Sequence, residues 1–435
     1  MATWRRASPL EGRRSLPKMS RDETSPLRTT AAAAAVVLVL LVMIWTTGRA
    51  GFASLLSTYA ARTNQLAAAN AAVRLSPNDP EAHYIRGAVL EASDDLAAAT
   101  AEYTQAVALR PDDYVLWLGL AHARELNGDM PGAIAAAGRA VQLAPYYAQP
   151  HWQLGNLLVR AGRQDGGFSE LRLAGAGNAT LLPAIIDLAW QLSRGDVAYV
   201  RQAIQPKSPE AYIALAEYLK KRGKPSEVVA LLRDAGSAVE DYRRQYLAEL
   251  IAARRFPDAY ALWSFAHPSD PDAENAAVAR GFEVESDLDE PGFGWRGKKT
   301  PGLLLSLDDA NPREGKSSLR IEFKGASEPD LVIISQLAMV RPQAHYQLHF
   351  AARTEEIVSG GLPGVTILDA GTGQALGQSG AFPLAGNGWR DYTVDFNTSA
   401  TTATIQIGLR RERCAKSPCP IFGRLWLDNF SLKRL

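Results

Sequence analysis

The sequence is poor in the residues that carry most protein chemistry. Its 435 residues include two cysteines and six histidines. It contains no G-x-S-x-G, no G-x-x-x-x-G-K-[ST] and no H-E-x-x-H, which excludes the hydrolase, nucleotide and zinc-protease sites that these motifs build. The net charge is +1, so no overall field attracts nucleic acid. We therefore expect neither a catalytic site nor a nucleic-acid partner.

A long uncharged run lies near the N-terminus. Residues 29–48 carry no charged side chain, and a helix of that length spans about 30 Å, the thickness of the apolar core of a bilayer. Residues 1–28 are basic and rich in serine and proline, which predicts a disordered segment on the cytoplasmic side. We expect a transmembrane helix at 29–48, with everything after about Gly51 outside the cytoplasm. The alternative is a signal peptide cleaved near Ala50.

A repeat with a period of 34 residues follows this run. Alanine stands at 72, 106 and 140, and proline follows five residues later at 77, 111 and 145. Small residues allow two helices to approach closely, and proline ends the second helix of each unit. We expect three helix pairs, at about 80–113, 114–147 and 148–175, that stack into an α-solenoid.

These units resemble tetratricopeptide (TPR) repeats. The signature positions are occupied most fully in the second unit, by Trp117, Leu120, Ala121, Gly128, Ala133, Ala137, Ala140 and Pro145. The third unit has Gly167 where alanine is usual, so we expect its two helices to pair more loosely. Degenerate helix pairs continue onward, which extends the predicted solenoid over 52–270. The resemblance implies a scaffold for protein–protein interaction.

One helix face of the repeat is the candidate protein-binding groove. Tyr84, Leu118 and Trp152 share one register, and His122 and Asn156 lie one helical turn further along the same face. An apolar stripe flanked by amides suits an extended peptide or an amphipathic helix. The alternative is that these large side chains pack between neighbouring repeats.

Other polar residues of the repeat are expected to be structural. His83 and His151 occupy equivalent positions near the interior of a helix pair, which predicts packing roles. Asp95 and Asp113 stand in the turns between helices, where aspartate caps the helix that follows.

Beyond residue 270 the sequence pattern changes. A turn-rich linker at 271–278 precedes segments in which apolar and polar residues alternate, as strands require. These segments are SLRIEFKG, YQLHFAART, GVTILDAG, WRDYTVDF, TATIQIGLR and GRLWLDNFSL. They predict an antiparallel β-sandwich over 279–435. The expected fold class is multidomain α plus β: a transmembrane helix, an α-solenoid and a C-terminal sandwich.

The C-terminal domain resembles the jelly-roll carbohydrate-binding modules of galactose-binding-like fold. The resemblance rests on the ordered motifs Gly281-Phe282-Glu283, Gly294-Trp295, Gly315 to Ile321, Tyr346-x-Leu348-x-Phe350, Trp389 and Leu425 to Asn429. It implies an outward sheet face on which a glycan lies. The candidate residues for that face are Gln347, His349, Arg353, Gln406, Arg410 and Trp295. The alternative is a solvated face, with Trp295 in the core or at its rim.

The same resemblance implies a structural calcium ion, the one cofactor expected here. Its carboxylate ligands would be Glu283 and Asp428, completed by backbone oxygens. Cys414 and Cys419 are predicted to form a disulfide, since this domain is expected outside the cytoplasm. Two free thiols are the alternative.

These expectations combine into one functional hypothesis. The chain is interpreted as a single-pass scaffold of a bacterial inner membrane, with its bulk in the periplasm and a protein partner bound by the solenoid. By resemblance, the pairing of domains suits cell-surface polysaccharide (exopolysaccharide) assembly or export. The alternative is a glycan-active enzyme, a hydrolase or transferase with a repeat platform, which two carboxylates converging in a cleft would favour.

Overall fold

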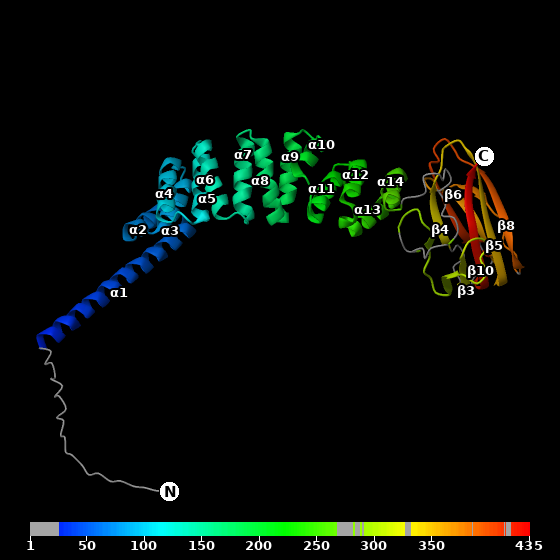
Figure 1. The fold of residues 1–435 in the computed structure, drawn as a ribbon, viewed down its shortest axis with the longest axis horizontal. Helices are drawn as coiled ribbons and strands as arrows, with labels where there is room; N and C mark the ends of the chain where they lie inside the picture. The colour runs from blue at the N-terminus through cyan, green and yellow to red at the C-terminus, as the bar shows by residue number, and fades with distance from the viewer. Residues whose placement is uncertain are drawn as a thin grey trace, which may run out of the picture. The chain divides into compact units, whose positions relative to one another are not determined.

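The protein is described by a computed structural model that covers residues 26–267, 282, 288, 291–326, 332–384, 386–412, 414 and 419–435. Helices precede two antiparallel sheets (Figure 1), which is the α plus β class expected from the sequence. The chain divides into two compact units, Met1–Gly177 and Asn178–Leu435. The predicted linker at 271–278 lies outside the described residues.

The first unit is made of helices that stand side by side in chain order from α3 to α8 (Figure 1). They are α1 (Pro26–Thr63), α2 (Leu66–Leu75), α3 (Pro80–Ala92), α4 (Leu96–Leu109), α5 (Tyr114–Leu126), α6 (Met130–Leu143), α7 (Ala148–Arg160) and α8 (Gln164–Gly177). The three expected repeat units correspond to the pairs α3–α4, α5–α6 and α7–α8.

Helix α1 combines an exposed apolar stretch with a packed one. Its side chains from Val36 to Trp45 are each more than half exposed, whereas Ala53 and Ala60 are fully buried. Its residues 33–63 are long and apolar enough to cross a membrane by length and composition, with a mean hydropathy of 1.9 in the most apolar window. Among the described residues, this helix alone meets that criterion.

Aspartates begin the helices of the first two repeat pairs. The Oδ1 atoms of Asp79, Asp95, Asp113 and Asp129 accept backbone N–H groups two or three residues ahead at 2.9–3.2 Å. These bonds satisfy amide groups that have no partner inside the helix. The predicted capping role of Asp95 and Asp113 is therefore confirmed.

One side chain in the first helix of each repeat pair (α3, α5 and α7) forms a hydrogen bond to the preceding turn. Nε2 of His83, Nε1 of Trp117 and Nε2 of His151 lie 2.8–2.9 Å from the carbonyl oxygen of the proline six residues earlier. Nδ1 of His83 lies 2.8 Å from Glu102, and Nδ1 of His151 lies 2.6 Å from Glu170. Both histidines are buried, which confirms their predicted packing role.

The third helix pair is closely packed, contrary to expectation. A Cβ atom on Gly167 would lie 2.5 Å from Cγ2 of Val159 and 2.9 Å from the carbonyl oxygen of Gly155. Glycine on both helices therefore lets the backbones of α7 and α8 meet. The prediction of looser pairing is wrong, because the missing side chain is replaced by a closer backbone contact.

The second unit begins with helices and ends in sheets. Its helical elements are η1 (Ala179–Leu181), α9 (Leu182–Leu192), α10 (Val197–Ile204), α11 (Pro209–Lys221), α12 (Pro225–Ala235), η2 (Gly236–Val239), α13 (Glu240–Ala252) and α14 (Phe256–Ala266). Its strands are β1 (Arg296–Gly297), β2 (Leu303–Asp308), β3 (Ser318–Ala326), β4 (Val332–Met339), β5 (His345–Ser359), β6 (Pro363–Asp369), β7 (Ala375–Gln378), β8 (Gly386–Asn397), β9 (Thr404–Arg411) and β10 (Ile421–Arg434).

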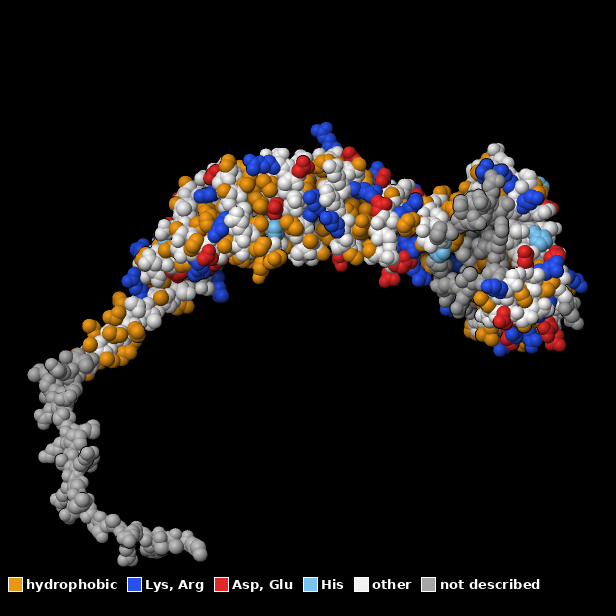
Figure 2. Space-filling model, viewed as in Figure 1, with side chains coloured by type: hydrophobic (Ala, Val, Ile, Leu, Met, Phe, Trp, Pro, Cys, Tyr) orange, Lys and Arg blue, Asp and Glu red, His pale blue; other side chains and the backbone are white. Residues whose placement is uncertain are grey.

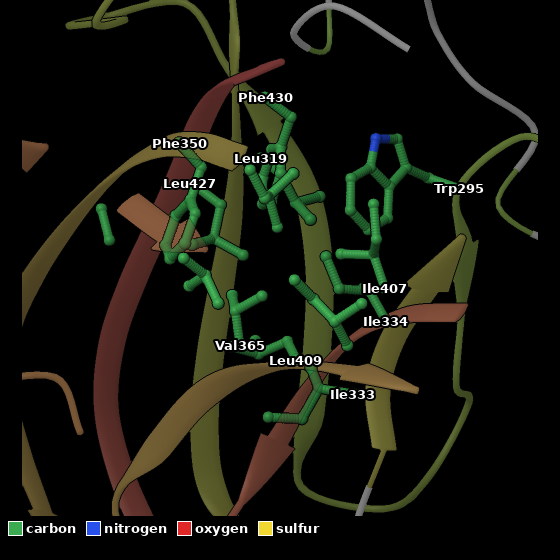
Figure 3. Packing of buried hydrophobic residues seen from close by; sticks show 14 of the residues in the cluster. Trp295, Leu319, Ile333, Ile334, Phe350, Val365, Ile407, Leu409, Leu427 and Phe430 are labelled. Carbon is green, nitrogen blue, oxygen red and sulfur yellow. The ribbon is translucent and has the colours of Figure 1, made fainter. Parts of the chain in front are cut away.

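The strands of the described residues form two antiparallel sheets of five strands each. The first sheet has the order β1-β4-β9-β6-β7, and the second sheet has the order β2-β3-β10-β5-β8. Alternate residues of both sheets contribute to one hydrophobic cluster, in which Leu348 and Phe350 of the second sheet and Ile405 and Ile407 of the first are fully buried. Figure 3 shows labelled side chains of both sheets directed into this cluster. The inward and outward alternation of β5 and β9 therefore follows the sequence pattern.

Candidate functional site

Helices α3, α5 and α7, together with Tyr103 of α4, line a groove of about 680 Å³ in the first unit, which we call the central groove. On the helical surface shown in Figure 2, apolar and charged side chains are interspersed without a large area of one charge sign. The residues that line the central groove are Tyr84, Glu91, Tyr103, Leu118, Gly119, His122, Glu125, Leu126, Gln149, Trp152, Gln153, Asn156 and Arg160.

All five residues predicted for the protein-binding site line this groove. They do not form an exposed apolar row, however, because Leu118 is only 5% exposed. Tyr84 and Trp152 are partly buried and border the groove, while the side chain of His122 is 51% exposed. The two interpretations therefore apply to different members of the set: Leu118 packs between helices, and the two aromatic rings retain an open side.

Charged pairs that the sequence reasoning missed connect neighbouring first helices at the groove. Nε2 of His122 lies 3.3 Å from Glu91, and the guanidinium of Arg160 lies 2.7 Å from Glu125. Glu91 and Glu125 are themselves 34 residues apart and lie two helical turns after Tyr84 and Leu118. That shared register was the signal that would have identified them.

The two tyrosines at the groove, one partly buried and one buried, keep their protons beside these carboxylates. Burial, followed by the nearby charges of Glu81 and Glu91, raises the pKa of Tyr84. Burial and the charge of Glu91 likewise raise the pKa of Tyr103 well above its ordinary value, so its hydroxyl donates to Oε2 of Glu91 at 3.3 Å. The groove is therefore bordered by neutral aromatic rings and fixed carboxylates.

Amide groups complete the groove. Nδ2 of Asn156 donates to the carbonyl oxygen of Trp152 at 2.7 Å, and Nε2 of Gln153 donates to that of Leu118 at 3.0 Å. Within the described ranges, the side chain of Gln149 and Oδ1 of Asn156 form no hydrogen bond. Free amide groups beside aromatic rings match the alternating polar and apolar character of an extended peptide.

The six residues predicted for a glycan face do not share one surface. Gln347, His349 and Arg353 point outward from β5 of the second sheet, whereas Gln406 and Arg410 belong to β9 of the first sheet. Trp295 is 3% exposed and packs against Phe282 and Phe430 in the core; Figure 3 shows its ring beside Ile407. Its ring is therefore unavailable for stacking against a sugar.

The structure describes one of the two predicted calcium ligands. Asp428 is fully buried, and its Oδ2 accepts the backbone N–H groups of Arg313 at 2.7 Å and Glu314 at 3.1 Å. Glu283 lies outside the described residues. Among the described side chains, no group of three or more His, Cys, Asp or Glu is arranged to hold a metal ion. Calcium binding therefore stays a prediction.

Cys414 and Cys419 are joined in a disulfide, with their Cα atoms 6.2 Å apart. The guanidinium of the buried Arg411 donates to the carbonyl oxygen of Cys419 at 2.9 Å and to Oγ of Ser359 at 2.9 Å. Burial lowers the pKa of Arg411. These contacts link Cys419 to Arg411 at the end of β9 and to Ser359 at the end of β5.

Comparison with known proteins gives partial overlaps. No family model and no curated protein match the chain. Among solved structures, a crystal structure of MamA is 20% identical, with a TM-score of 0.25, and the overlap covers 26% of this chain and 67% of that one. YrrB, described as a TPR protein with an unusual peptide-binding site, is 19% identical, with a TM-score of 0.32, over 40% of this chain and 90% of that one.

A third overlap involves a xylanase. The CBM22-1 and GH10 modules of xylanase 10B from Clostridium thermocellum, complexed with xylohexaose, are 11% identical to this chain. The TM-score is 0.26, and the overlap covers 37% of this chain and 28% of the xylanase chain. The overlap thus spans less than a third of that protein.

Proposed function

We propose that the chain is a non-catalytic scaffold whose central groove binds an extended peptide segment of a protein partner. The observation that carries this proposal is a groove of about 680 Å³ bordered by Tyr84 and Trp152, with the amide of Gln149 free of hydrogen bonds in the described structure. Aromatic rings supply apolar contact area, and amides pair with peptide backbone groups.

Phage display against the full-length protein tests this function with a defined probe. We expect selected 12-residue peptides to lose about 2 kcal/mol of binding free energy, or about 30-fold in affinity, with Trp152→Ala. Tyr146→Ala is the matched control, because Tyr146 is 93% exposed in the turn before α7 and does not line the groove. Peptides that bind Trp152→Ala as tightly as the unaltered protein would show that the groove is not the binding site.

The scaffold is proposed to be anchored in the inner membrane with its bulk in the periplasm. The continuity of α1 supports this, since one helix carries both the exposed apolar stretch and the buried Ala53 and Ala60. Reporter fusions at residue 60 should report a location outside the cytoplasm, and the protein should resist extraction by alkaline carbonate. A cytoplasmic reporter signal would contradict the anchoring, and a soluble form starting near Gly51 would replace the anchor with a cleaved signal.

A second candidate function is contact with a glycan during cell-surface polysaccharide assembly or export. It is favoured by the outward row of Gln347, His349 and Arg353 on β5, which faces Asp391 and Asp395 of β8. Nε2 of Gln347 donates to Asp395 at 2.9 Å. Planar polar groups of this kind pair with sugar hydroxyls. Titration of the full-length protein with acidic and neutral saccharides tests this contact.

A further inference from the structure

The outer face of the second sheet carries an arginine held between two indole rings. Arg353 of β5 stands opposite Trp426 of β10. Its guanidinium carbon lies 4.0 Å from the ring centroid of Trp426 and 6.0 Å from that of Trp389 on β8. Contacts at this range are favourable cation–π interactions, and they orient the plane of the guanidinium.

Both indole rings are fixed through their N–H groups. Nε1 of Trp426 donates to Oδ2 of Asp308 at 2.6 Å, and Nε1 of Trp389 donates to the carbonyl oxygen of Asn311 at 3.1 Å. The bond from Trp426 holds the pKa of Asp308 below its ordinary value, although burial opposes it, so the carboxylate stays charged and keeps the ring in place. Trp426 is 4% exposed beneath Arg353, while Trp389 is only partly buried.

Arg353 differs from its neighbours in forming no ion pair within 4.0 Å among the described residues, although its charge, after the hydrogen bond from Trp426, also helps to lower the pKa of Asp308. The other arginines of this face are ion-paired: Arg313 with Asp391 at 2.8 Å, Arg424 with Glu355 at 3.0 Å and Arg320 with Glu322 at 3.6 Å. Across the described ranges, no carboxylate lies within 4.0 Å of the guanidinium of Arg353. Nε of Arg320, on the other side of Trp426, is buried and has no hydrogen-bond partner in the described structure.

We propose that Arg353, supported by Arg320, binds the carboxylate group of an acidic saccharide, with the sugar ring resting against Trp389. A planar guanidinium donates two parallel N–H bonds to a carboxylate, and it does so most effectively when its orientation is already fixed. The partly exposed ring of Trp389 offers the flat apolar surface on which the C–H groups of a sugar stack. This inference rests on the glycan contact proposed above and names its ligand class.

A carboxylate-bearing saccharide fits this site better than an acidic peptide. An aspartate or glutamate side chain places its carboxylate on a narrow flexible stem, which leaves the face of Trp389 uncovered. In a uronic acid the carboxylate is attached directly to a ring. One ligand then occupies both the guanidinium and the indole.

Calorimetric titration of the full-length protein in detergent tests the inference. The probes are trigalacturonate, the neutral trisaccharide of galactose and a triglutamate peptide. We expect trigalacturonate to bind with a millimolar Kd, at least about 10-fold more tightly than either other probe, since one charge-assisted bidentate pair contributes on that scale. Binding should weaken as salt is added.

Variants separate a specific site from general charge. Arg353→Gln should weaken trigalacturonate binding about 10-fold, and Arg353→Lys should give an intermediate affinity, because charge is kept and the paired geometry is lost. Lys433→Gln is the control: Lys433 is exposed, pairs with Gln347 in the same sheet and lies about 20 Å along the strand from Arg353. It should change the affinity less than twofold.

Each contrary result overturns a different statement. Equal binding of the acidic and neutral trisaccharides would end the acidic specificity and leave the glycan contact standing. If neither saccharide binds at about 10 mM, both the acidic specificity and the glycan contact are contradicted. Triglutamate binding as tightly as trigalacturonate, or equal losses from Arg353→Gln and Lys433→Gln, would show that the site does not recognise an acidic sugar.

Discussion

Two sets of first helices, α3, α5 and α7 in one unit and α9, α11 and α13 in the other, use aromatic and charged side chains differently. In the first set, Tyr84 and Trp152 border a groove of about 680 Å³. In the second set, tyrosine hydroxyls of the first helices are themselves bonded to charged groups. The hydroxyl of Tyr218 donates to Oδ1 of Asp187 at 2.7 Å and accepts from Arg222 at 2.7 Å.

The contacts of the second set continue from helix to helix. The hydroxyl of Tyr242 donates to Glu217 at 2.7 Å, and Lys220 contacts Glu217 at 3.3 Å and Glu249 at 2.8 Å. Burial and the bond to Asp187 raise the pKa of Tyr218 to about 12, so that hydroxyl remains a donor at neutral pH. A connected network of this kind stabilises the stacking of helices.

The difference indicates where a partner can gain binding energy. A polar group that is already paired loses its bond when a ligand approaches, whereas an open one gains a bond. The network on α9, α11 and α13 is therefore expected to act in stability. The central groove, with the free amide of Gln149 and the open sides of two aromatic rings, is expected to act in binding.

The largest effect should come from placing a larger side chain where the backbones of α7 and α8 meet. Gly167→Val places a Cβ atom 2.5 Å from Cγ2 of Val159, so the helices must separate. We expect a loss of about 3 kcal/mol in the free energy of unfolding, measured with urea, together with loss of peptide binding because α7 carries Trp152.

The neighbouring glycine provides the control for this substitution. A Cβ atom on Gly166 would meet only Cδ1 of Leu158, at 3.8 Å, so Gly166→Ala should be neutral or slightly stabilising. Similar losses at positions 166 and 167 would contradict the close approach of the two helices.

A smaller effect should distinguish the paired network from the open groove directly. Tyr218→Phe removes a hydroxyl that bridges Asp187 and Arg222, and we expect it to lower the free energy of unfolding by about 1 kcal/mol. Tyr84→Phe removes a hydroxyl that forms no hydrogen bond in the described structure, so stability should change by less than about 0.5 kcal/mol. Thermal unfolding followed by circular dichroism measures both; equal changes would remove the contrast.

The sequence pattern was informative where structure is local or repeated. The 34-residue period predicted the helix pairs, and the shared register of Tyr84, Leu118 and Trp152 predicted which residues meet at the groove. The burial of Leu118 could not be read from the period, because it depends on how closely α5 packs against its neighbours. The shared register of Glu91 and Glu125 marks these two carboxylates in the sequence. Their pairing with a partner such as Arg160 does not follow from the register, because it depends on the conformations of long side chains.

The sheets show a different limit of sequence reasoning. Alternation separated inward from outward residues on β5 and β9, because the side-chain period of a strand is two. It did not reveal that these strands belong to different sheets, since strand order is set by contacts distant in the chain. The assignment of Gln347 and Gln406 to one face is therefore wrong. The site around Arg353 depends on the adjacency of β10, β5 and β8, which the sequence pattern does not predict.

The smallest predicted effect is a loss of stability in acid that both helical regions share. Burial raises the pKa of Glu102, but hydrogen bonds from Arg86 and His83 outweigh it, so the pKa lies below the ordinary value of 4.5. A hydrogen bond from Tyr242 is the main cause that lowers the pKa of Glu217, against the effect of burial. A carboxyl whose folded pKa is lowered stabilises the protein above its unfolded pKa, and this stabilisation is lost as the pH falls through the folded value.

We therefore expect the helices to unfold more easily as the pH falls below about 4.5. Their unfolding is followed by circular dichroism. Glu102→Gln should reduce the pH-dependent change in the free energy of unfolding by less than about 1 kcal/mol. Glu217→Gln should reduce it less, because the side chain of Glu217 is 37% exposed whereas that of Glu102 is 14% exposed. Glu314→Gln, an exposed carboxyl with no ion pair in the described ranges, serves as the control. If Glu102→Gln and Glu314→Gln give the same pH profile, the contacts of Glu102 with His83 and Arg86 do not stabilise the first helix pair in solution.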